Sequence, residues 1–267
     1  MRDKIISLPP INGRVCFLSD CHFGLPDWPE SRKREERLTA FLDSIAAEVT
    51  HLFLLGDVFD FWFEYKDVIP KHCLRFLGRL AELADRGVQV YYILGNHDMW
   101  SFSYIQEEVG LTQIKGMVDV EINGKRVRMG HGDALDPKDY GYHLIKWIYA
   151  QPFNQRLFAM LHPRQSFALA RAVSMKSRRA HEEADKVFLG EKEPIIRYCR
   201  EVLEQTHFDY FIFGHRHLPA DYPLTEDSRY FNTGDWLYHD SYLMLHEGEA
   251  VLSHFEADAF VCGRGNG

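Results

Sequence analysis

Short apolar runs recur along the chain, and each gives way abruptly to glycine or serine followed by Asp, Asn or His. Apolar runs of this length, bounded by turn signals, predict strands that are buried on both faces. The runs are residues 15–19, 52–55, 88–94 and 210–213. Apolar side chains at helical spacing occupy the segments between them, at about residues 31–48, 71–85 and 194–205. This alternation of strand and helix predicts an α/β fold with a largely parallel sheet.

Two further patterns predict antiparallel pairing. Residues 118–122 and 127–129 flank Asn123-Gly124, which is the strongest short signal for a hairpin turn. Three segments near the C-terminus are also expected to form antiparallel strands, at 229–232, 241–245 and 250–255. The β structure is therefore expected to be mixed.

Polar motifs follow the apolar runs at what should be one edge of the sheet. The motifs are Asp20-x-His22, Gly56-Asp57, Gly95-Asn96-His97-Asp98, Gly130-His131 and Gly214-His215-x-His217. Ligands of open α/β sheets bind outside the carboxyl ends of the strands. If the chain stays extended beyond the first run, Asp20 and His22 face the same side and can share one metal ion. A purely structural role has no use for so many titratable groups at one edge, so the motifs predict a metal centre.

The types of donor narrow the choice of metal. Carboxylate, amide oxygen and imidazole form a mixed set of hard and borderline ligands, which suits Mn²⁺, Fe or Zn²⁺ better than Ca²⁺ or a thiolate site. Seven ligands of these types are already too many for one ion, and the motifs offer at least that number. Two ions about 3.5–4 Å apart, bridged by one carboxylate, would use them all, and such pairs serve in-line displacement at phosphorus.

Composition excludes several classes of protein. The formal net charge of −8 argues against a general nucleic-acid binder. The five cysteines form no C-x-x-C pair, so neither a disulfide framework nor a zinc ribbon is expected. The first ten residues lack the apolar stretch of a signal peptide, and no run approaches the roughly 18 residues of a transmembrane helix. The expected location is the cytoplasm.

One segment departs from the acidic balance of the chain. Residues 140–181 contain seven Lys or Arg and no Asp or Glu. Apolar side chains recur there at helical spacing, with breaks near Pro152 and Pro163, which predicts two or three amphipathic helices inserted at about 136–192 into a single domain spanning 1–267. The segment is either a helical subdomain with solvated basic residues or an apolar, cationic surface for an anionic amphiphile or membrane.

The series of motifs resembles the calcineurin-like metallophosphoesterases over roughly residues 15–235. The resemblance implies a four-layer α/β/β/α sandwich and a cofactor of two Mn²⁺ ions, with Fe or Zn as alternatives. It also implies two sets of ligands. The first metal would be held by Asp20, His22, Asp57 and His217, and the second by Asn96, His131 and His215, with Asp57 bridging.

Within this family the chain is most similar to the UDP-2,3-diacylglucosamine pyrophosphatases of lipid A biosynthesis. The similar features are the aromatic-rich block Gly56–Trp62, the run His131–Leu135 followed by Asp139–Tyr142, and an insertion where those enzymes carry a helical lid. The resemblance implies cleavage of a lipid-linked UDP-sugar to UMP and 2,3-diacylglucosamine 1-phosphate, called lipid X. It also implies peripheral attachment to the inner face of the cytoplasmic membrane through the lid, with no nucleic acid and no protein partner.

Roles for the remaining polar residues are hypotheses. His97 would stabilise charge on the transferring phosphoryl group or act as a general acid, and the first role is preferred because a phosphate leaving group departs without much protonation. Asp98 would orient the His97 ring or cap a helix. The expected substrate contacts are Tyr142, Arg171, Lys176, Arg178 and Arg179. For Tyr142, packing within the lid is the alternative.

Two other functions fit the same motifs. The chain could be a metallophosphoesterase for another phosphodiester or phosphomonoester, or a metal-binding scaffold without catalysis. The acid-free apolar segment favours the lipid substrate, because a soluble nucleotide has no need of it. The complete set of metal ligands favours an enzyme over a scaffold.

Overall fold

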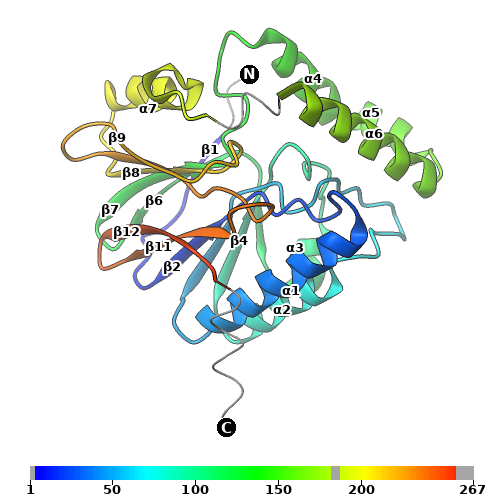
Figure 1. The fold of residues 1–267 in the computed structure, drawn as a ribbon, viewed down its shortest axis with the longest axis horizontal. Coiled ribbons are helices and arrows are strands. Elements are labelled where there is room, and N and C mark those ends of the chain that lie inside the picture. The colour runs from blue at the N-terminus through cyan, green and yellow to red at the C-terminus, as the bar shows by residue number, and fades with distance from the viewer. Residues whose placement is uncertain (1–3, 182–186, 257–267) are drawn as a thin grey trace.

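Two six-stranded sheets pack face to face, and helices cover the outer face of each, as Figure 1 shows. The computed structural model describes residues 4–181 and 187–256, without the side chains of residues 176–181. The strands are β1 Ile5–Ser7, β2 Val15–Leu18, β3 His51–Leu54, β4 Gln89–Ile93, β5 Thr112–Ile114, β6 Met117–Ile122, β7 Lys125–Gly130, β8 Tyr210–Phe213, β9 Ala220–Pro223, β10 Arg229–Asn232, β11 Ser241–His246 and β12 Glu249–His254. The α-helices are α1 Trp28–Ile45, α2 Leu74–Asp85, α3 Tyr104–Val109, α4 Tyr140–Ala150, α5 Pro152–Ala159, α6 Pro163–His181 and α7 Pro194–Leu203.

Alternate side chains of the central strands serve two different cores. In β2, Cys16 and Leu18 pack against α1 and α2, whereas Val15 and Phe17 pack between the sheets. A third core, which includes Phe211 of β8, lies between the sheet that contains β8 and α7. Each fully buried side chain of this size contributes about 1.5–3 kcal/mol. The result is the four-layer α/β/β/α sandwich that the family resemblance implied, so the predicted fold is confirmed.

Parallel pairing brings the ends of the central strands together. The first sheet has the order β12-β11-β2-β3-β4-β5, and the second has β1-β6-β7-β8-β10-β9. In the first sheet Leu18 of β2 lies opposite Leu54 of β3, which lies opposite Tyr92 of β4. In the second, Gly130 of β7 lies opposite Phe213 of β8. The polar motif that follows each of these strands therefore lies beside the motif that follows its neighbour.

The C-terminal strands do not form one antiparallel set, which corrects the prediction from the sequence. β11 and β12 pair antiparallel, but β10 lies in the other sheet, parallel to β8 and antiparallel to β9. The reason is burial on both faces, since Tyr230 packs beneath α7 and Phe231 packs between the sheets. A strand with two apolar faces fits the interior of a sheet, whereas the half-exposed β12 fits an edge.

Three helices, α4 to α6, occupy the acid-free segment, in agreement with the prediction of two or three. α5 and α6 begin at Pro152 and Pro163. Proline suits the first helical position because its missing N–H has no partner there in any case. Figure 1 shows these helices standing off the end of the sandwich. Within the described residues, no helix combines the length and apolar character needed to cross a membrane.

Gly78 in the middle of α2 allows a test of the fold that leaves the polar motifs untouched. Gly78 is exposed, and a Cβ added there meets no atom within 4 Å. Gly78→Ala is expected to raise the free energy of unfolding by about 0.5–1 kcal/mol, because glycine loses more conformational entropy than alanine in a helix. Urea denaturation measures the change. Gly87→Ala is the control, since φ is +93° at Gly87 and alanine should be destabilising there.

Candidate dinuclear metal centre

The predicted ligands lie on loops beyond the strands, and their backbone is not extended. β2 ends at Leu18, and Asp20 and His22 have φ angles of 53° and 42°. The expectation that an extended chain aims these two side chains to one side is therefore wrong. They converge because the loop after β2 runs beside the loop after β3. The Asp20 N–H donates to the Gly56 carbonyl at 3.0 Å, and the His22 N–H donates to the Asp57 carbonyl at 2.9 Å.

A left-handed backbone recurs among the predicted ligands. Positive φ angles occur at Asp20, His22, Asp57, His215 and His217. Such a conformation costs on the order of 1–3 kcal/mol at a residue other than glycine and is typical of functional sites. The glycines beside the ligands allow close approach. A Cβ on Gly95 would lie 2.2 Å from Asp57 Oδ1, so only glycine fits there.

Asp20, His22 and His217 form the first group of side chains that could hold a metal ion. His217 Nε2 lies 3.5 Å from Asp20 Oδ1 and 3.3 Å from His22 Nε2, and His22 Nε2 lies 3.6 Å from Asp20 Oδ1. Asp20 and His22 are fully buried. Asp20 Oδ1 has no hydrogen-bond partner. Burial of such an oxygen is unfavourable unless a cation or a donor meets it.

Asp57, His131 and His215 form a second group, and Asn96 lies beside it. His131 Nε2 lies 3.2 Å from Asp57 Oδ2 and 3.1 Å from Asn96 Oδ1. Asp57 Oδ2 also lies 3.7 Å from His22 Nε2 of the first group. Asp57 therefore stands between the two groups, where a ligand shared by two ions has to stand.

Electrostatic interactions favour the metal-binding form at two of the donors, Asp57 and His215. Burial alone would raise the pKa of Asp57, but His131, His97 and His22 together outweigh burial and hold the pKa of this carboxyl well below its usual range. Burial and then the nearby His131 lower the pKa of His215 to about 3, so that imidazole is neutral near pH 7. His131 Nδ1 lies 2.8 Å from the Leu55 carbonyl, which can only accept, so Nε2 faces Asp57. Ionised carboxylates and neutral imidazoles are the forms that coordinate metal ions.

His97 lies beside these groups and remains accessible, with 21% of its side chain exposed. Its Nδ1 lies 2.8 Å from the backbone carbonyl of Asp60, and its Nε2 lies 4.0 Å from Asp57 Oδ2. The carbonyl of Asp60 therefore fixes the ring with Nε2 directed toward the centre.

Asp98 takes neither of the roles predicted for it. Its carboxylate accepts hydrogen bonds from the Gly95 and Val58 N–H groups, each at 2.8 Å, and from the Tyr92 hydroxyl. Asp98 thus ties the loop after β4 to the loop after β3, while His97 is oriented by Asp60. No helix in the described part of the chain begins at Asp98.

Asp235, which is not among the residues predicted from the sequence, supports His217. Asp235 Oδ2 lies 3.3 Å from His217 Nδ1, and Oδ1 accepts two backbone N–H groups of the following turn at 3.0 Å. A carboxylate on the far nitrogen of a ligand histidine fixes the ring and increases its basicity. A signal was present, because Gly234-Asp235 follows β10 much as Gly56-Asp57 follows β3.

Asp235→Ala is expected to weaken metal binding about 10- to 100-fold, because His217 loses the carboxylate that orients its ring. Titration of the metal-free protein with Mn²⁺ measures the affinity. Asp240→Ala is the matched control from the same loop, where Asp240 accepts hydrogen bonds from Arg37 at 2.8 and 3.0 Å. The control should stay within about twofold of the unaltered protein. Unchanged affinity in Asp235→Ala would contradict the supporting role.

The residues present fit a pair of divalent cations. The donors are carboxylates, an amide oxygen and imidazoles, which together suit Mn²⁺, Fe or Zn²⁺. Asp20 Oδ1 is buried without a hydrogen-bond partner, and Asp57 faces both groups of histidines. Both observations are explained by cations bound between these side chains.

Two of the five predicted substrate contacts have described side chains. Tyr142 in α4 donates its hydroxyl to Asp133 at 2.9 Å, and Lys146 pairs with the same carboxylate at 2.8 Å. Arg171 in α6 donates to the Pro26 carbonyl at 2.6 Å. The side chains of Lys176, Arg178 and Arg179 lie outside the described part of the structure. All five substrate roles therefore stay predictions.

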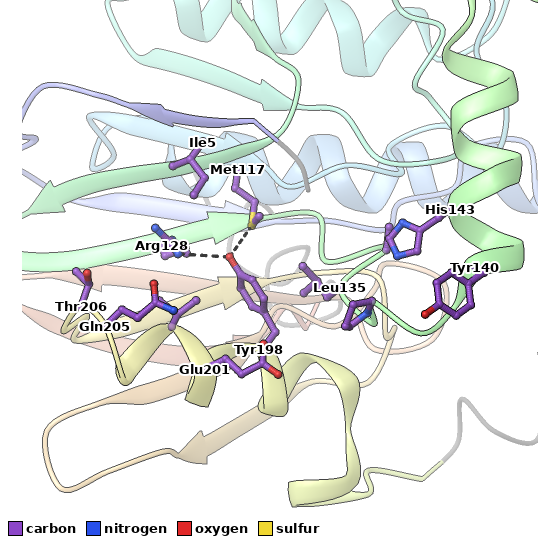
Figure 2. Close-up of a pocket in the computed structure, with 13 residues that line it drawn as sticks. Ile5, Met117, Arg128, Leu135, Tyr140, His143, Tyr198, Glu201, Gln205 and Thr206 are labelled. Atoms are coloured by element: carbon purple, nitrogen blue, oxygen red, sulfur yellow. Dashed lines mark hydrogen bonds between the residues drawn. The ribbon is translucent and has the colours of Figure 1, made fainter. Parts of the chain in front are cut away.

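A cavity of about 420 Å³ lies between α7, the edge of the second sheet and the turn before α4, as Figure 2 shows. The Tyr198 hydroxyl donates to Met117 Sδ at 3.2 Å and accepts from Arg128 at 3.4 Å (Figure 2). Arg128 also pairs with Asp119 at 2.7 Å. The cavity and the predicted metal ligands share no residue, so the chemistry belongs to the metal centre and not to this cavity.

The family profile described as "Calcineurin-like phosphoesterase" matches residues 13–219. The chain is a calcineurin-like phosphoesterase. The matched range contains all the predicted metal ligands, from Asp20 to His217. The residues that match the family profile are therefore the same residues that form the candidate metal centre of this phosphoesterase.

Two curated relatives resemble this phosphoesterase along nearly their whole lengths. A protein of Porphyromonas gingivalis named UDP-2,3-diacylglucosamine hydrolase is 34% identical over 92% of this chain and 99% of that protein. A protein of the same name from Aeromonas salmonicida is 28% identical over 88% of this chain and 91% of that protein. A solved archaeal phosphodiesterase structure aligns with a TM-score of 0.44 and 12% identity over 91% of this chain and 99% of that chain.

Proposed function

We propose that this phosphoesterase hydrolyses the diphosphate of UDP-2,3-diacylglucosamine to UMP and 2,3-diacylglucosamine 1-phosphate. Water adds to one phosphorus and the anhydride bond to the other phosphate breaks. The observation that carries the proposal is the 34% identity to the Porphyromonas gingivalis hydrolase over 99% of that protein. The groups of carboxylate and histidine ligands support it, because hydrolysis at phosphorus is served by paired metal ions.

Seven side chains would hold two cations. The first cation would be held by Asp20, His22, Asp57 and His217. The second would be held by Asn96, His131 and His215, and Asp57 would serve both cations. Mn²⁺ is the ion we expect, and Fe or Zn²⁺ suits the same donors. When bound, the ions supply Lewis-acid stabilisation of negative charge on the phosphoryl group. The position of Asp57 Oδ2, 3.2 Å from His131 Nε2 and 3.7 Å from His22 Nε2, supports the shared ligand.

His97 would stabilise the negative charge that develops on the transferring phosphoryl group. Its Nδ1 is held by the Asp60 carbonyl at 2.8 Å, which leaves Nε2 facing the centre. The leaving group of diphosphate cleavage is itself a phosphate and needs little protonation, so an electrostatic role is expected rather than general-acid catalysis.

The helices α4 to α6 would form a lid that accommodates the acyl chains and meets the membrane. The exposed apolar side chains of these helices and the turns between them include Tyr140, Phe153 and Met160, which are 78%, 68% and 82% exposed. Residues 140–181 contain no Asp or Glu. A surface that is both apolar and cationic suits acyl chains and an anionic bilayer. Peripheral attachment to the inner face of the cytoplasmic membrane is therefore part of the proposal.

The deciding experiment incubates the purified protein and Mn²⁺ with UDP-2,3-diacylglucosamine and, separately, with a soluble chromogenic phosphodiester. Release of UMP from the lipid substrate is expected, and EDTA should abolish it. Turnover of the soluble diester without UMP would exclude the lipid-linked substrate and leave a phosphoesterase of another specificity. Metal binding without turnover of either compound would indicate a scaffold.

A further inference from the structure

The carboxylate of Asp60 connects helix α6 to two histidine rings of the metal centre. Ser174 in α6 donates its hydroxyl to Asp60 Oδ1 at 2.8 Å, and both residues are only 6% exposed. The same Oδ1 lies 3.6 Å from His97 Nδ1 and 3.7 Å from His22 Nδ1. One buried oxygen thus contacts the helix and lies close to both rings.

His22, Asp60 and His97 are close enough to one another to hold a cation, but their hydrogen bonds indicate a different role. His97 Nδ1 donates to the Asp60 carbonyl, and Asp60 Oδ1 accepts from Ser174. His22 turns its other nitrogen, Nε2, toward Asp57 at 3.7 Å. A carboxylate beside the far nitrogen of a ligand histidine orients the ring. Asp60 is therefore placed to position these histidines.

The loop that carries Asp60 is also packed under α5 and α6. The centroid of the Phe61 ring lies 5.7 Å from that of Phe158 and 5.4 Å from that of Phe167. The Phe158 ring contacts Trp100 as well, at a centroid distance of 4.7 Å. A shift of these helices would therefore move the loop. It would also move the Asp60 carboxylate, because Ser174 of α6 is hydrogen-bonded to it.

We propose that Asp60 is a positioning residue that couples the docking of α6, through Ser174, to the orientation of the His22 and His97 rings. The inference rests on the proposed catalytic role of the centre and not on the identity of the substrate. It makes the helices part of the catalytic apparatus, so docked α6 raises kcat even for a substrate without acyl chains. A lid that only holds lipid would leave turnover of a soluble diester unchanged.

The test measures kcat and KM of the whole protein with Mn²⁺ and bis(4-nitrophenyl) phosphate. Ser174→Ala is expected to lower kcat about 10-fold and leave KM within about twofold, because Asp60 loses the buried hydrogen bond that holds it. Ser174→Thr keeps the hydroxyl and should restore kcat to within about threefold. Should Ser174→Ala fail to fold, Ser174→Cys fills the same space with a weaker hydrogen bond and carries the same expectation.

Ser166→Ala is the matched control. Ser166 is a buried serine of the same helix whose hydroxyl meets Tyr65 instead of Asp60. Its removal disturbs the seating of α6 to a similar extent without reaching Asp60, so kcat should remain within about twofold. Equal losses of kcat in Ser166→Ala and Ser174→Ala would overturn the proposal, as would an unchanged kcat in Ser174→Ala.

A double-mutant cycle shows whether Ser174 acts through Asp60. Asp60→Ala is expected to lower kcat about 10- to 100-fold. Adding Ser174→Ala to that variant should reduce kcat by less than about a further twofold, because the partner is already absent. A full additional 10-fold loss would mean that Ser174 acts by another route.

The same series on UDP-2,3-diacylglucosamine separates this inference from the proposed function. Turnover of the soluble diester without UMP release would refute the proposed lipid-linked substrate. The kcat values of the variants on the soluble diester would still test the coupling. Abundant UMP release, together with equal kcat values for the unaltered protein and the Ser174 variants, would refute the coupling alone. A protein that turns over neither compound would refute both.

Discussion

Asp57→Asn should reduce hydrolysis at least about 1,000-fold and lower the bound metal below two ions per chain. Asparagine keeps the shape of the side chain and tolerates the left-handed backbone, where φ is 51° at Asp57, so the fold should persist. What is lost is the negative charge between the His22 and His131 rings. A 1,000-fold loss corresponds to about 4 kcal/mol at 1.36 kcal/mol per tenfold, which is in the range expected for a metal-supported step.

Metal analysis of the dialysed variant and its kcat on the soluble diester together measure this effect. Asp221→Asn is the matched control, because Asp221 lies on β9 and pairs with Arg229 at 2.8 Å in an exposed ion pair. Exposed pairs contribute little, so the control should keep its metal content and stay within about twofold in kcat. Two ions per chain and full activity in Asp57→Asn would refute the shared ligand.

Phe153→Asp combined with Met160→Asp should lower binding to anionic vesicles at least about 100-fold. These side chains are 68% and 82% exposed in the acid-free segment, Phe153 on α5 and Met160 directly after it. Each substitution removes an apolar side chain whose burial in lipid contributes about 1.5–3 kcal/mol. Each also places a negative charge against an anionic surface, at about 1 kcal/mol per charge. The variant should also release UMP more slowly from vesicle-borne substrate.

Co-sedimentation with vesicles of phosphatidylglycerol and phosphatidylethanolamine measures this binding. Leu74→Asp combined with Val251→Asp is the control, since these apolar side chains are 77% and 55% exposed but lie on α2 and β12. The control should bind vesicles as the unaltered protein does. If both double variants bind equally well, α4 to α6 are not the membrane surface.

The positions of the candidate ligands could be predicted because they share a local cause. Gly56-Asp57 follows β3 after a single residue, and His131 directly follows Gly130, the last residue of β7. Parallel pairing of neighbouring strands then brings these motifs together. Their geometry could not be predicted in the same way. Asp20 and His22 are turned by hydrogen bonds to the loop after β3, and nothing in the spacing of these two residues shows that loop to be adjacent.

Roles that depend on distant partners were not accessible from the sequence. Asp98 is held by the Val58 N–H, 40 residues away, and therefore joins two loops instead of orienting His97. Asp60 meets Ser174, 114 residues away, across the interface with α6. A motif fixes which side chain is available at a strand end, but the tertiary partner determines what that side chain does.

The left-handed backbone at five of the candidate ligands lowers the stability of the fold at the positions that the proposed activity requires. Each such residue costs on the order of 1–3 kcal/mol, and glycine or asparagine would relieve much of that cost. Variants at these positions would then be more robust to heat and inert as enzymes. Directed evolution of this protein for thermal tolerance alone would erase its metal centre first, so any such screen has to select for turnover at every round.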